Sequence, residues 1–274
     1  MTDRYCVIGN PIAHSKSPDI HAAFGEQTGQ QLSYERCLAP IDGFAATVRE
    51  LIASGCKGAS VTVPFKLEAH DLATSLSPRA RAAGAVNTLL LGPGGIHGDN
   101  TDGAGLVNDI LRNAQVAIAG KRVLMLGAGG AVRGAILPLL AEGPRELVIA
   151  NRTRATADTL VARFTAETTP GQRIAACDYA EVDSEFDIVI NGTSASLAAD
   201  MPPVPGAAFG PGTLAFDMMY GSKPTLFMEF AAARGATARD GLGMLVEQAA
   251  EAFLLWRGVR PATDTILQRL RAAL

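Results

Sequence analysis

The sequence predicts an α/β protein with two domains, each built on a mainly parallel sheet. In the first third of the 274 residues, short apolar runs alternate with helical patterns, and a second such series starts near Lys121. Strands that alternate with helices form βα units, which place parallel strands side by side and cover them with helices. With 48% hydrophobic and 19% charged residues, the chain has the composition of a globular protein that can fill two cores.

The first series starts almost at the N-terminus, with an apolar strand over residues 5–8. Ser17 and Pro18 have the residue types of a helix cap and a first helical position, which predicts a helix over 17–28. Apolar and β-branched runs then predict strands, and helical periodicity predicts one more helix. These elements are strands over 32–38, 59–63 and 85–91 and a helix over 44–53, and the last strand is followed by the turn signal GPGG.

The second series begins with the apolar strand RVLML at 122–126, which leads through a glycine-rich turn into a helix. A polar stretch over 105–120 fits a helix that links the two series. The remaining elements predicted in this series are strands over 146–151, 173–176, 186–191 and 213–216 and a helix over 154–164.

Two helical patterns, over 244–256 and 262–273, close the chain. We expect these helices to return to the first domain and pack on it. The predicted domains are therefore 1–104 together with 241–274, and 105–240.

The composition excludes several classes of protein. A net charge of −3 gives no basic surface for nucleic acid, and no stretch approaches the roughly 18 apolar residues of a membrane span. The N-terminus lacks the layout of a signal peptide, and the four cysteines are scattered without a C-x-x-C pair. We therefore expect a cytoplasmic protein with reduced cysteines. The four histidines show no metal spacing, so no metal is expected.

The glycine-rich turn after the strand at 122–126 predicts a dinucleotide site. Gly127 and Gly129 have the G-x-G spacing of a tight turn, in which the backbone approaches a pyrophosphate at the N-terminus of the next helix. The third position of this fingerprint is Val132 rather than glycine, and many glycine-rich turns bind nothing. The order strand, turn, helix, strand nevertheless favours a dinucleotide or a related phosphate ligand.

The residues after the next strand favour NADP over NAD. Enzymes that use NAD place a carboxylate there, about 20 residues beyond the glycines, to bind the ribose 2′-hydroxyl. This chain has Asn151, Arg152, Thr153 and Arg154 instead. Arginine forks match phosphate oxygens, so the segment suits the 2′-phosphate of NADP. The alternative is a solvated helix start with two surface arginines.

A lysine stands just beyond the apolar strand predicted over 59–63. Pro64 stops this strand, and Lys66 follows at its carboxyl end. Lysine is rarely buried, and open α/β sheets bind their ligands at the carboxyl ends of the strands. Lys66 is therefore a candidate site residue.

Nine motifs, spread in order along nearly the whole chain, resemble those of the shikimate dehydrogenase family. They are GNPIAHSKSPDIH at 9–21, SVTVPFK at 60–66, GAVNTL at 84–89, GDNTDGAG at 98–105, GAGGA at 127–131, NRT at 151–153, NGTS at 191–194, DMMY at 217–220 and DGLGMLVEQA at 240–249. The resemblance implies an N-terminal substrate domain and a Rossmann-type NADP domain, with both ligands in the cleft between them. The segment at 67–80 is the part least like the family.

The resemblance implies a reversible reaction in aromatic amino-acid biosynthesis, in which NADPH reduces 3-dehydroshikimate to shikimate. Lys66 is implied to exchange a proton with this substrate while Asp102 holds the lysine in place. Ser15 and Ser17 are implied to bind the substrate carboxylate, although Ser17 has the alternative of a plain helix cap. The other substrate-binding residues that the resemblance implies are Thr62, Asn87, Tyr220 and Gln248.

The resemblance also implies a set of cofactor residues. They are Gly127, Ala128, Gly129, Gly130 and Ala131 of the glycine-rich turn, Asn151, Arg152, Thr153 and Arg154 beyond the next strand, and Thr193, Met218 and Gly241. Two alternatives stay open at this point: a quinate/shikimate dehydrogenase that uses NAD or NADP, and a nucleotide-sensing protein without catalysis. Members of the family are monomers or homodimers, and the sequence does not choose between them.

Overall fold

The computed structural model describes residues 2–195 and 200–274 and confirms the α/β class. The chain divides into two compact units. Unit 1 comprises Met1–Gly105 and Val246–Ala272, and unit 2 comprises Leu106–Leu245 and Ala273–Leu274. The assignment of the two units to substrate and cofactor remains a prediction.

Unit 1 contains a six-stranded sheet in the order β2-β1-β3-β5-β6-β4. The strands β2, β1 and β3 are parallel to one another, whereas β5 runs antiparallel to both β3 and β6. Their bounds are β1 Asp3–Gly9, β2 Leu32–Leu38, β3 Cys56–Val61, β4 Ser75–Leu76, β5 Thr88–Gly92 and β6 Gly95–Asp99.

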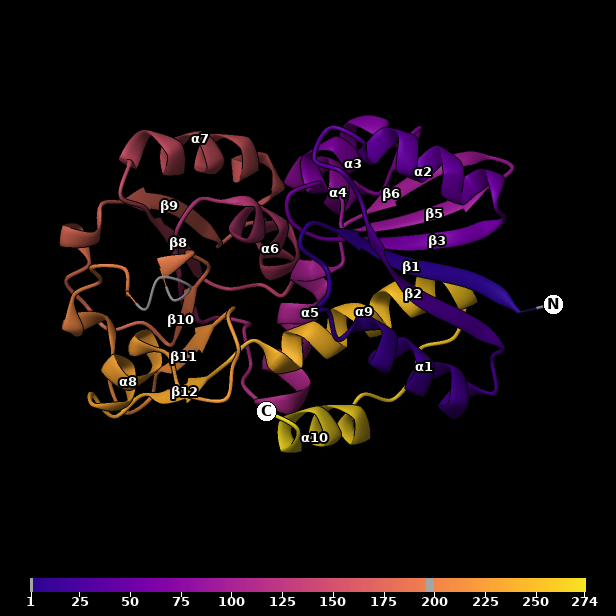
Figure 1. The fold of residues 1–274 in the computed structure, drawn as a ribbon. Coiled ribbons are helices and arrows are strands. Elements are labelled where there is room, and N and C mark those ends of the chain that lie inside the picture. The colour runs from indigo at the N-terminus through magenta and orange to yellow at the C-terminus, as the bar shows by residue number, and fades with distance from the viewer. Residues whose placement is uncertain (1, 196–199) are drawn as a thin grey trace. The chain divides into compact units, whose positions relative to one another are not determined.

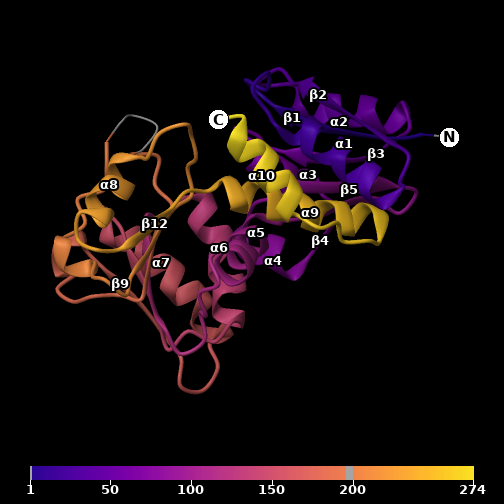
Figure 2. The ribbon, with the colours of Figure 1, turned by 90° about the horizontal axis from the view of Figure 1, so that it is seen from below.

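Helices cover both faces of this sheet. In Figure 1, α2, α3 and α4 lie on one side of the sheet, and α1 lies on the other with the unit 1 part of α9. Figure 2, seen from below, shows α9 and α10 on the near side of the same strands. The helix bounds are α1 Ser17–Thr28, α2 Phe44–Ala53, α3 Lys66–Leu72, α4 Pro78–Ala83, α9 Leu242–Arg257 and α10 Asp264–Ala272. Most of α9 and all of α10 thus belong to the same compact unit as the first part of the chain.

The two faces of the unit 1 sheet have different cores. Phe44 and Val48 of α2 are buried together with Phe65 on one face. The other face carries a group of stacked and edge-on rings, in which His21 of α1 lies against Tyr34 of β2. The remaining members of this aromatic group are Tyr5, Phe24, Phe253 and Trp256.

Several predictions for unit 1 were wrong in detail. The strand predicted over 85–91 is the first arm of a hairpin, because the GPGG turn leads back into β6, which was not predicted. The strand predicted over 59–63 ends at Val61, and Lys66 is the first residue of α3 rather than the end of a strand. Lys16, not Ser17, is the N-cap of α1, and no side chain caps this helix. The short elements β4, α3 and α4 carry too little periodicity to be predicted.

Three of the four cysteines, which are scattered in the sequence, are neighbours in the sheet. All four are free thiols. Cys6 on β1 interacts through hydrogen bonds with Cys37 on β2 and Cys56 on β3, and these contacts together with burial raise the pKa of the Cys6 thiol. The thiol of Cys6 is therefore unreactive as an isolated nucleophile.

Unit 2 contains a six-stranded sheet in which every strand is parallel, in the order β12-β11-β10-β7-β8-β9. This is the order of a doubly wound dinucleotide-binding fold, with the switch point between β7 and β10. In Figure 1, α7 lies beside β9, and α8 lies beside β11 and β12. The bounds are β7 Arg122–Leu126, β8 Glu146–Ala150, β9 Arg173–Cys177, β10 Ile188–Asn191, β11 Leu214–Asp217, β12 Thr237–Arg239, α6 Gly130–Ala141, α7 Arg154–Phe164 and α8 Leu226–Ala232.

The helix that links the two series of strands is shorter than predicted. In place of one helix over 105–120, α5 spans Asp102–Asn108 and a π-helical turn spans Asp109–Asn113. Asp109 is fully buried and accepts hydrogen bonds from Arg239 and Asn113. Arg239 lies 130 positions away in sequence, so the pattern of residues 105–120 alone could not predict this contact. None of the helices described in either unit is long and apolar enough to cross a membrane.

Candidate active site

The side chains of Lys66 and Asp102 form an ion pair in unit 1. Lys66 Nζ lies 2.6 Å from Asp102 Oδ2, and the two side chains are 30% and 12% exposed. The buried ring of Phe65 anchors the residue before Lys66, and the Lys66 carbonyl accepts the N–H of Val86. The backbone of Lys66, at the start of α3, is therefore held in place, while its side-chain ammonium stays partly exposed to solvent.

Asn87 connects this ion pair to the rest of the site. Its amide Nδ2 donates to Asp102 Oδ1 at 2.8 Å and to Gln248 Oε1 at 3.2 Å. Its carbonyl Oδ1 accepts the N–H of Thr101 at 2.8 Å and the hydroxyl of Thr88 at 2.9 Å. A buried amide with partners on both ends holds one orientation.

Four of the predicted residues are thus brought together: Lys66, Asn87, Asp102 and Gln248. Sequence reasoning missed Thr101, whose buried hydroxyl donates to Gln248 Oε1 at 3.3 Å, and Thr88 beside it. Each lies next to a predicted residue, within a motif that resembles the family. Their position in GAVNTL and GDNTDGAG was the only available signal.

The serines of the HSKSP segment contact each other rather than the amide network. Ser15 Oγ accepts the backbone N–H of Ser17 at 3.3 Å and lies 3.2 Å from Ser17 Oγ. The side chain with a local backbone role is therefore that of Ser15, and the predicted capping role of Ser17 was wrong. Two further hydroxyls were not predicted: Tyr34 donates to Ser60 Oγ at 2.7 Å and also interacts with Ser17.

The position of Thr62 depends on a glycine in the neighbouring strand. A Cβ added at Gly9 would lie 2.5 Å from the methyl group of Thr62, so only glycine leaves room for this threonine. Thr62 also closes the turn before Lys66, because its carbonyl accepts the N–H of Phe65 at 3.0 Å. The residue is half-buried and is fixed to the same turn as the lysine.

In unit 2, the glycine-rich turn forms an open cradle at the start of α6. Gly127 has a φ of +101°, which only glycine adopts without strain, and an added Cβ would lie 3.0 Å from Thr193. A Cβ added at Gly129 or Gly130 would meet no atom within 4 Å. Space is therefore left above the first N–H groups of a twelve-residue helix, an arrangement that suits a pyrophosphate.

The segment after β8 contains two arginines, of which one forms ion pairs and the other does not. Arg154 pairs with Asp158 at 3.0 Å and with Glu181 at 2.7 Å. Arg152 is exposed and forms none of the ion pairs found in the described residues. Asn151 donates to the carbonyl of Thr153, which fixes the turn before α7. A phosphate at this segment would meet Arg152 directly, whereas Arg154 would have to exchange a carboxylate for it.

The predicted residues at the end of unit 2 lie in a tight backbone arrangement. The N–H of Met218 donates to the carbonyl of Asn191, and the N–H of Gly241 donates to the carbonyl of Met219. A Cβ added at Gly241 would lie 2.2 Å from the Met218 carbonyl oxygen, so this close approach requires glycine. Burial and the nearby Asp240 carboxylate raise the pKa of Tyr220, whose hydroxyl therefore remains a donor.

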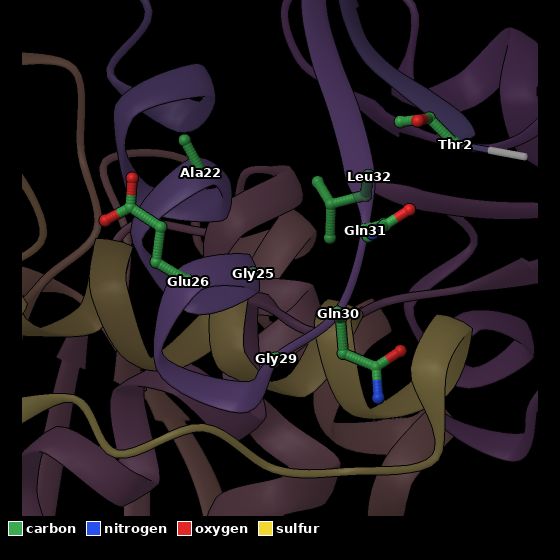
Figure 3. A pocket seen from close by; sticks show the side chains of 8 residues that line it. All are labelled: Thr2, Ala22, Gly25, Glu26, Gly29, Gln30, Gln31 and Leu32. Carbon is green, nitrogen blue, oxygen red and sulfur yellow. The ribbon is translucent and has the colours of Figure 1, made fainter.

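A separate pocket of about 500 Å³ lies in unit 1 between the end of α1 and the start of β2 (Figure 3). Its lining includes Glu26, Gln30 and Leu32, and it contains no predicted site residue. The described ranges 2–195 and 200–274 contain no group of three or more histidine, cysteine or acidic residues that could hold a metal ion.

Comparisons with known proteins match both units. Family models match residues 7–89 (Shikimate dehydrogenase substrate binding domain), 109–199 (Shikimate / quinate 5-dehydrogenase) and 241–271 (Shikimate 5'-dehydrogenase C-terminal domain). A relative from Herminiimonas arsenicoxydans, named Shikimate dehydrogenase (NADP(+)), is 62% identical and covers 100% of this chain and 99% of its own.

Two solved structures are similar over nearly the whole chain. An Ael1 enzyme from Pseudomonas putida has a TM-score of 0.93 and 47% identity, over 98% of each chain. A shikimate 5-dehydrogenase from Thermus thermophilus, solved in complex with NADP(H) and shikimate, has a TM-score of 0.88 and 32% identity, over 100% of each chain.

Proposed function

This chain belongs to the shikimate dehydrogenase family, and we therefore propose that it catalyses the reversible reduction of 3-dehydroshikimate by NADPH. The observation that carries the proposal is the Lys66–Asp102 ion pair, which is joined through Asn87 to Gln248. An ammonium, an amide and a carboxylate converge there, which are the groups needed to bind a ring hydroxyl and move its proton.

The proposed reaction moves one hydride and one proton. NADPH supplies the hydride to the ring carbonyl carbon when it is bound. The Lys66 ammonium gives a proton to the oxygen that becomes a hydroxyl, and the lysine regains a proton from solvent through its exposed side. In the oxidative direction the same nitrogen takes the hydroxyl proton. The sum is 3-dehydroshikimate, NADPH and one proton giving shikimate and NADP⁺.

The other residues are proposed to bind and orient the substrate. Ser15 and Ser17 lie at the N-terminal end of α1, where the helix dipole favours a carboxylate. Thr62, Asn87 and Gln248 would contact the ring hydroxyls, and Tyr220 of unit 2 is proposed for the carboxylate end. This division fits a small anion with several hydroxyl groups.

The cofactor is proposed to lie along the carboxyl ends of β7, β8 and β10. Gly127, Ala128, Gly129, Gly130 and Ala131 would hold the pyrophosphate, and the open space above Gly129 and Gly130 supports this. Asn151, Arg152, Thr153 and Arg154 would surround the 2′-phosphate of NADP, with Arg152 as the arginine that needs no rearrangement. Thr193, Met218 and Gly241 are proposed to lie at the nicotinamide end.

Absorbance of NADPH tests the function directly. Mixing the protein with shikimate and NADP at alkaline pH, where oxidation is favoured, should produce NADPH. Lys66→Ala should lower kcat by about 100-fold or more, the usual scale for a general acid or base, with a smaller change in KM. Lys57→Ala, on the exposed side of β3, is the matched control and should behave like wild type. An effect of Lys66→Ala on KM alone would make the lysine a binding residue.

The same assay separates the alternatives. Turnover of quinate with NAD at the rate of shikimate with NADP would support an enzyme of relaxed specificity, which the names of the relatives do not favour. Absence of any NADPH formation would support a nucleotide sensor. The proposed enzyme acts in the cytoplasm as a monomer or homodimer, and sedimentation velocity distinguishes these two states.

A further inference from the structure

We propose that Arg79 and Arg260 are positioning residues for the substrate site, acting through an ion-pair network that joins the residues around Asn87 and Asp102 to the helix that carries Gln248. The network consists of Asp99, Arg79, Glu251, Arg260 and Glu247. It assigns a role to the segment at 67–80, to which the family motifs give none. The inference rests on the proposed function, because it concerns the same site.

One end of the network is anchored beside the candidate acid–base pair. Arg79 of α4 forms a fork with Asp99, with Nε 2.8 Å from Oδ1 and a terminal nitrogen 2.6 Å from Oδ2. Asp99 also accepts the hydroxyl of Ser77 and the N–H of Asn100. Burial opposes the charge of Asp99, but Arg79 and the other donors outweigh it and hold the pKa of this carboxyl below its usual value.

Asp99 and the residue after it hold the backbone of the residues that line the site. Its backbone carbonyl accepts the N–H of Asn87 at 3.0 Å. The next residue, Asn100, donates its amide to the carbonyl of Ala85 and accepts the N–H of Asp102 at 3.2 Å. A shift of Asp99 would therefore move both Asn87 and Asp102, the two residues that contact one another through Nδ2 and Oδ1.

The other end of the network holds α9. Arg260 donates to Glu251 at 3.0 Å and to Glu247 at 2.7 Å, and Thr263 donates to Glu247 at 2.6 Å. The Glu247 side chain is fully buried, and its carboxylate forms an ion pair with Arg260. Glu251 stands four positions after Glu247 and three after Gln248, and side chains at these spacings are neighbours on the helix surface.

Arg79 joins the two ends, because its second terminal nitrogen lies 3.8 Å from Glu251. The hydrogen bonds of Gln248 with Asn87 and Thr101 are long, at 3.2 and 3.3 Å. Small displacements of α9 would break such bonds, whereas three carboxylates and two guanidiniums resist them together. We therefore infer that the ion pairs of Glu251 and Glu247 hold the helix segment of Gln248 in register with Asn87.

The test uses two kinds of variant and one control. Arg79→Gln removes the link between α4 and α9. Because a lone Arg260→Gln would leave Glu247 charged and buried, Arg260→Gln is combined with Glu247→Gln. Arg4→Gln, at an exposed arginine of β1, is the matched control. Steady-state kinetics give KM for shikimate and for NADP, and hydrogen exchange is measured on peptides covering 99–105 and 246–252.

We expect both test variants to raise KM for shikimate by about tenfold while KM for NADP changes by less than about twofold, since only substrate-binding groups are displaced. In a Gln248→Ala background, Arg79→Gln should raise KM for shikimate little further, because the contact that Arg79 positions is already lost. Exchange should accelerate in both peptides, and Arg4→Gln should match wild type.

Two results would overturn the proposal. One is an unchanged KM for shikimate in both variants despite a lower melting temperature, which would leave the network with a structural role only. The other is unchanged exchange in the two peptides. If the wild-type protein does not oxidise shikimate at all, the proposed function fails, and the exchange measurement still decides whether the network holds α9 to β6.

Discussion

His21 is a buried histidine whose ring nitrogens have no hydrogen-bond partner among the described residues. It is 1% exposed and stacks on Tyr34 with ring centroids 4.3 Å apart and planes 8° apart. Phe24 and Trp256 approach the same ring. Since no described residue hydrogen-bonds to the ring, burial lowers the pKa of His21 to about 3.

This pKa makes the stability of unit 1 depend on pH in a defined window. Above the unfolded pKa of about 6.5, the residue is neutral in both states and its titration contributes nothing. As the pH falls below that value, the unfolded chain binds a proton that the folded protein refuses, so the free energy of unfolding falls. At about pH 5 the loss is about 2 kcal/mol, from about 1.5 pH units at about 1.36 kcal/mol each.

Replacing His21 by phenylalanine keeps a ring in the stack and removes the titration. We expect wild-type protein to lose about 2 kcal/mol more than His21→Phe between about pH 7.5 and about pH 5, whatever the stability of the variant at neutral pH. Urea unfolding at both pH values measures this difference. Trp256, the single tryptophan, lies 5.2 Å from His21 and reports the unfolding of unit 1 by fluorescence.

The control is His14→Phe, which removes an exposed histidine from the same unit. It should keep the pH dependence of the wild type. Equal losses in wild type and His21→Phe would refute the reasoning, because they would mean that the folded protein accepts a proton at His21.

Three further substitutions, with one control, test the two sites. Asp102→Asn removes the carboxylate partner of Lys66, so kcat for shikimate oxidation should fall by about tenfold or more. A near-wild-type kcat would show that the ion pair is dispensable. Glu181→Gln removes one of the two carboxylates paired with Arg154, which makes this arginine more available to a phosphate, so KM for NADP should fall by about twofold at low salt. Steady-state kinetics should show the effect fading as salt is added. Gly241→Ala places a Cβ against the Met218 carbonyl and should cost about 1–3 kcal/mol in thermal unfolding. Gly221→Ala, whose added Cβ would approach only one atom within 4 Å, should change little.

Unit 2 was the more predictable half of the fold. Five of the six strands described in unit 2 are short apolar runs, and the G-x-G turn after β7 identified the first βα unit. The sixth strand, β12 with the sequence TAR, and the helix α8 were not predicted, because both are too short to carry a clear periodic pattern. In unit 1, the apolar run before GPGG predicts a strand but does not indicate whether that strand is parallel or antiparallel to its neighbours. Only the length of the connection, a hairpin turn instead of a helix, determines that β5 and β6 run in opposite directions.

For the candidate sites, the sequence could indicate residues but not the contacts between them. The motif order identified Lys66, Asn87, Asp102 and Gln248, which the structure joins. The pairing of Arg154 with Glu181 could not be predicted, since the two residues are 27 positions apart and meet only when α7 and the turn after β9 are folded. The same holds for Arg79 and Glu251, which belong to helices at opposite ends of the sequence.

The two oxygens of Asp102 explain why Asn87 should affect chemistry as well as binding. Oδ1 accepts the amide of Asn87, and Oδ2 pairs with Lys66. A lysine ammonium has three N–H donors, so the pair with Asp102 leaves two for other acceptors, and the fixed carboxylate sets their direction. Removing the Asn87 amide would free the carboxylate to rotate and would misdirect the ammonium. A loss of kcat in an Asn87 variant would therefore report the orientation of Lys66, whereas a change in KM alone would report a lost contact with the substrate.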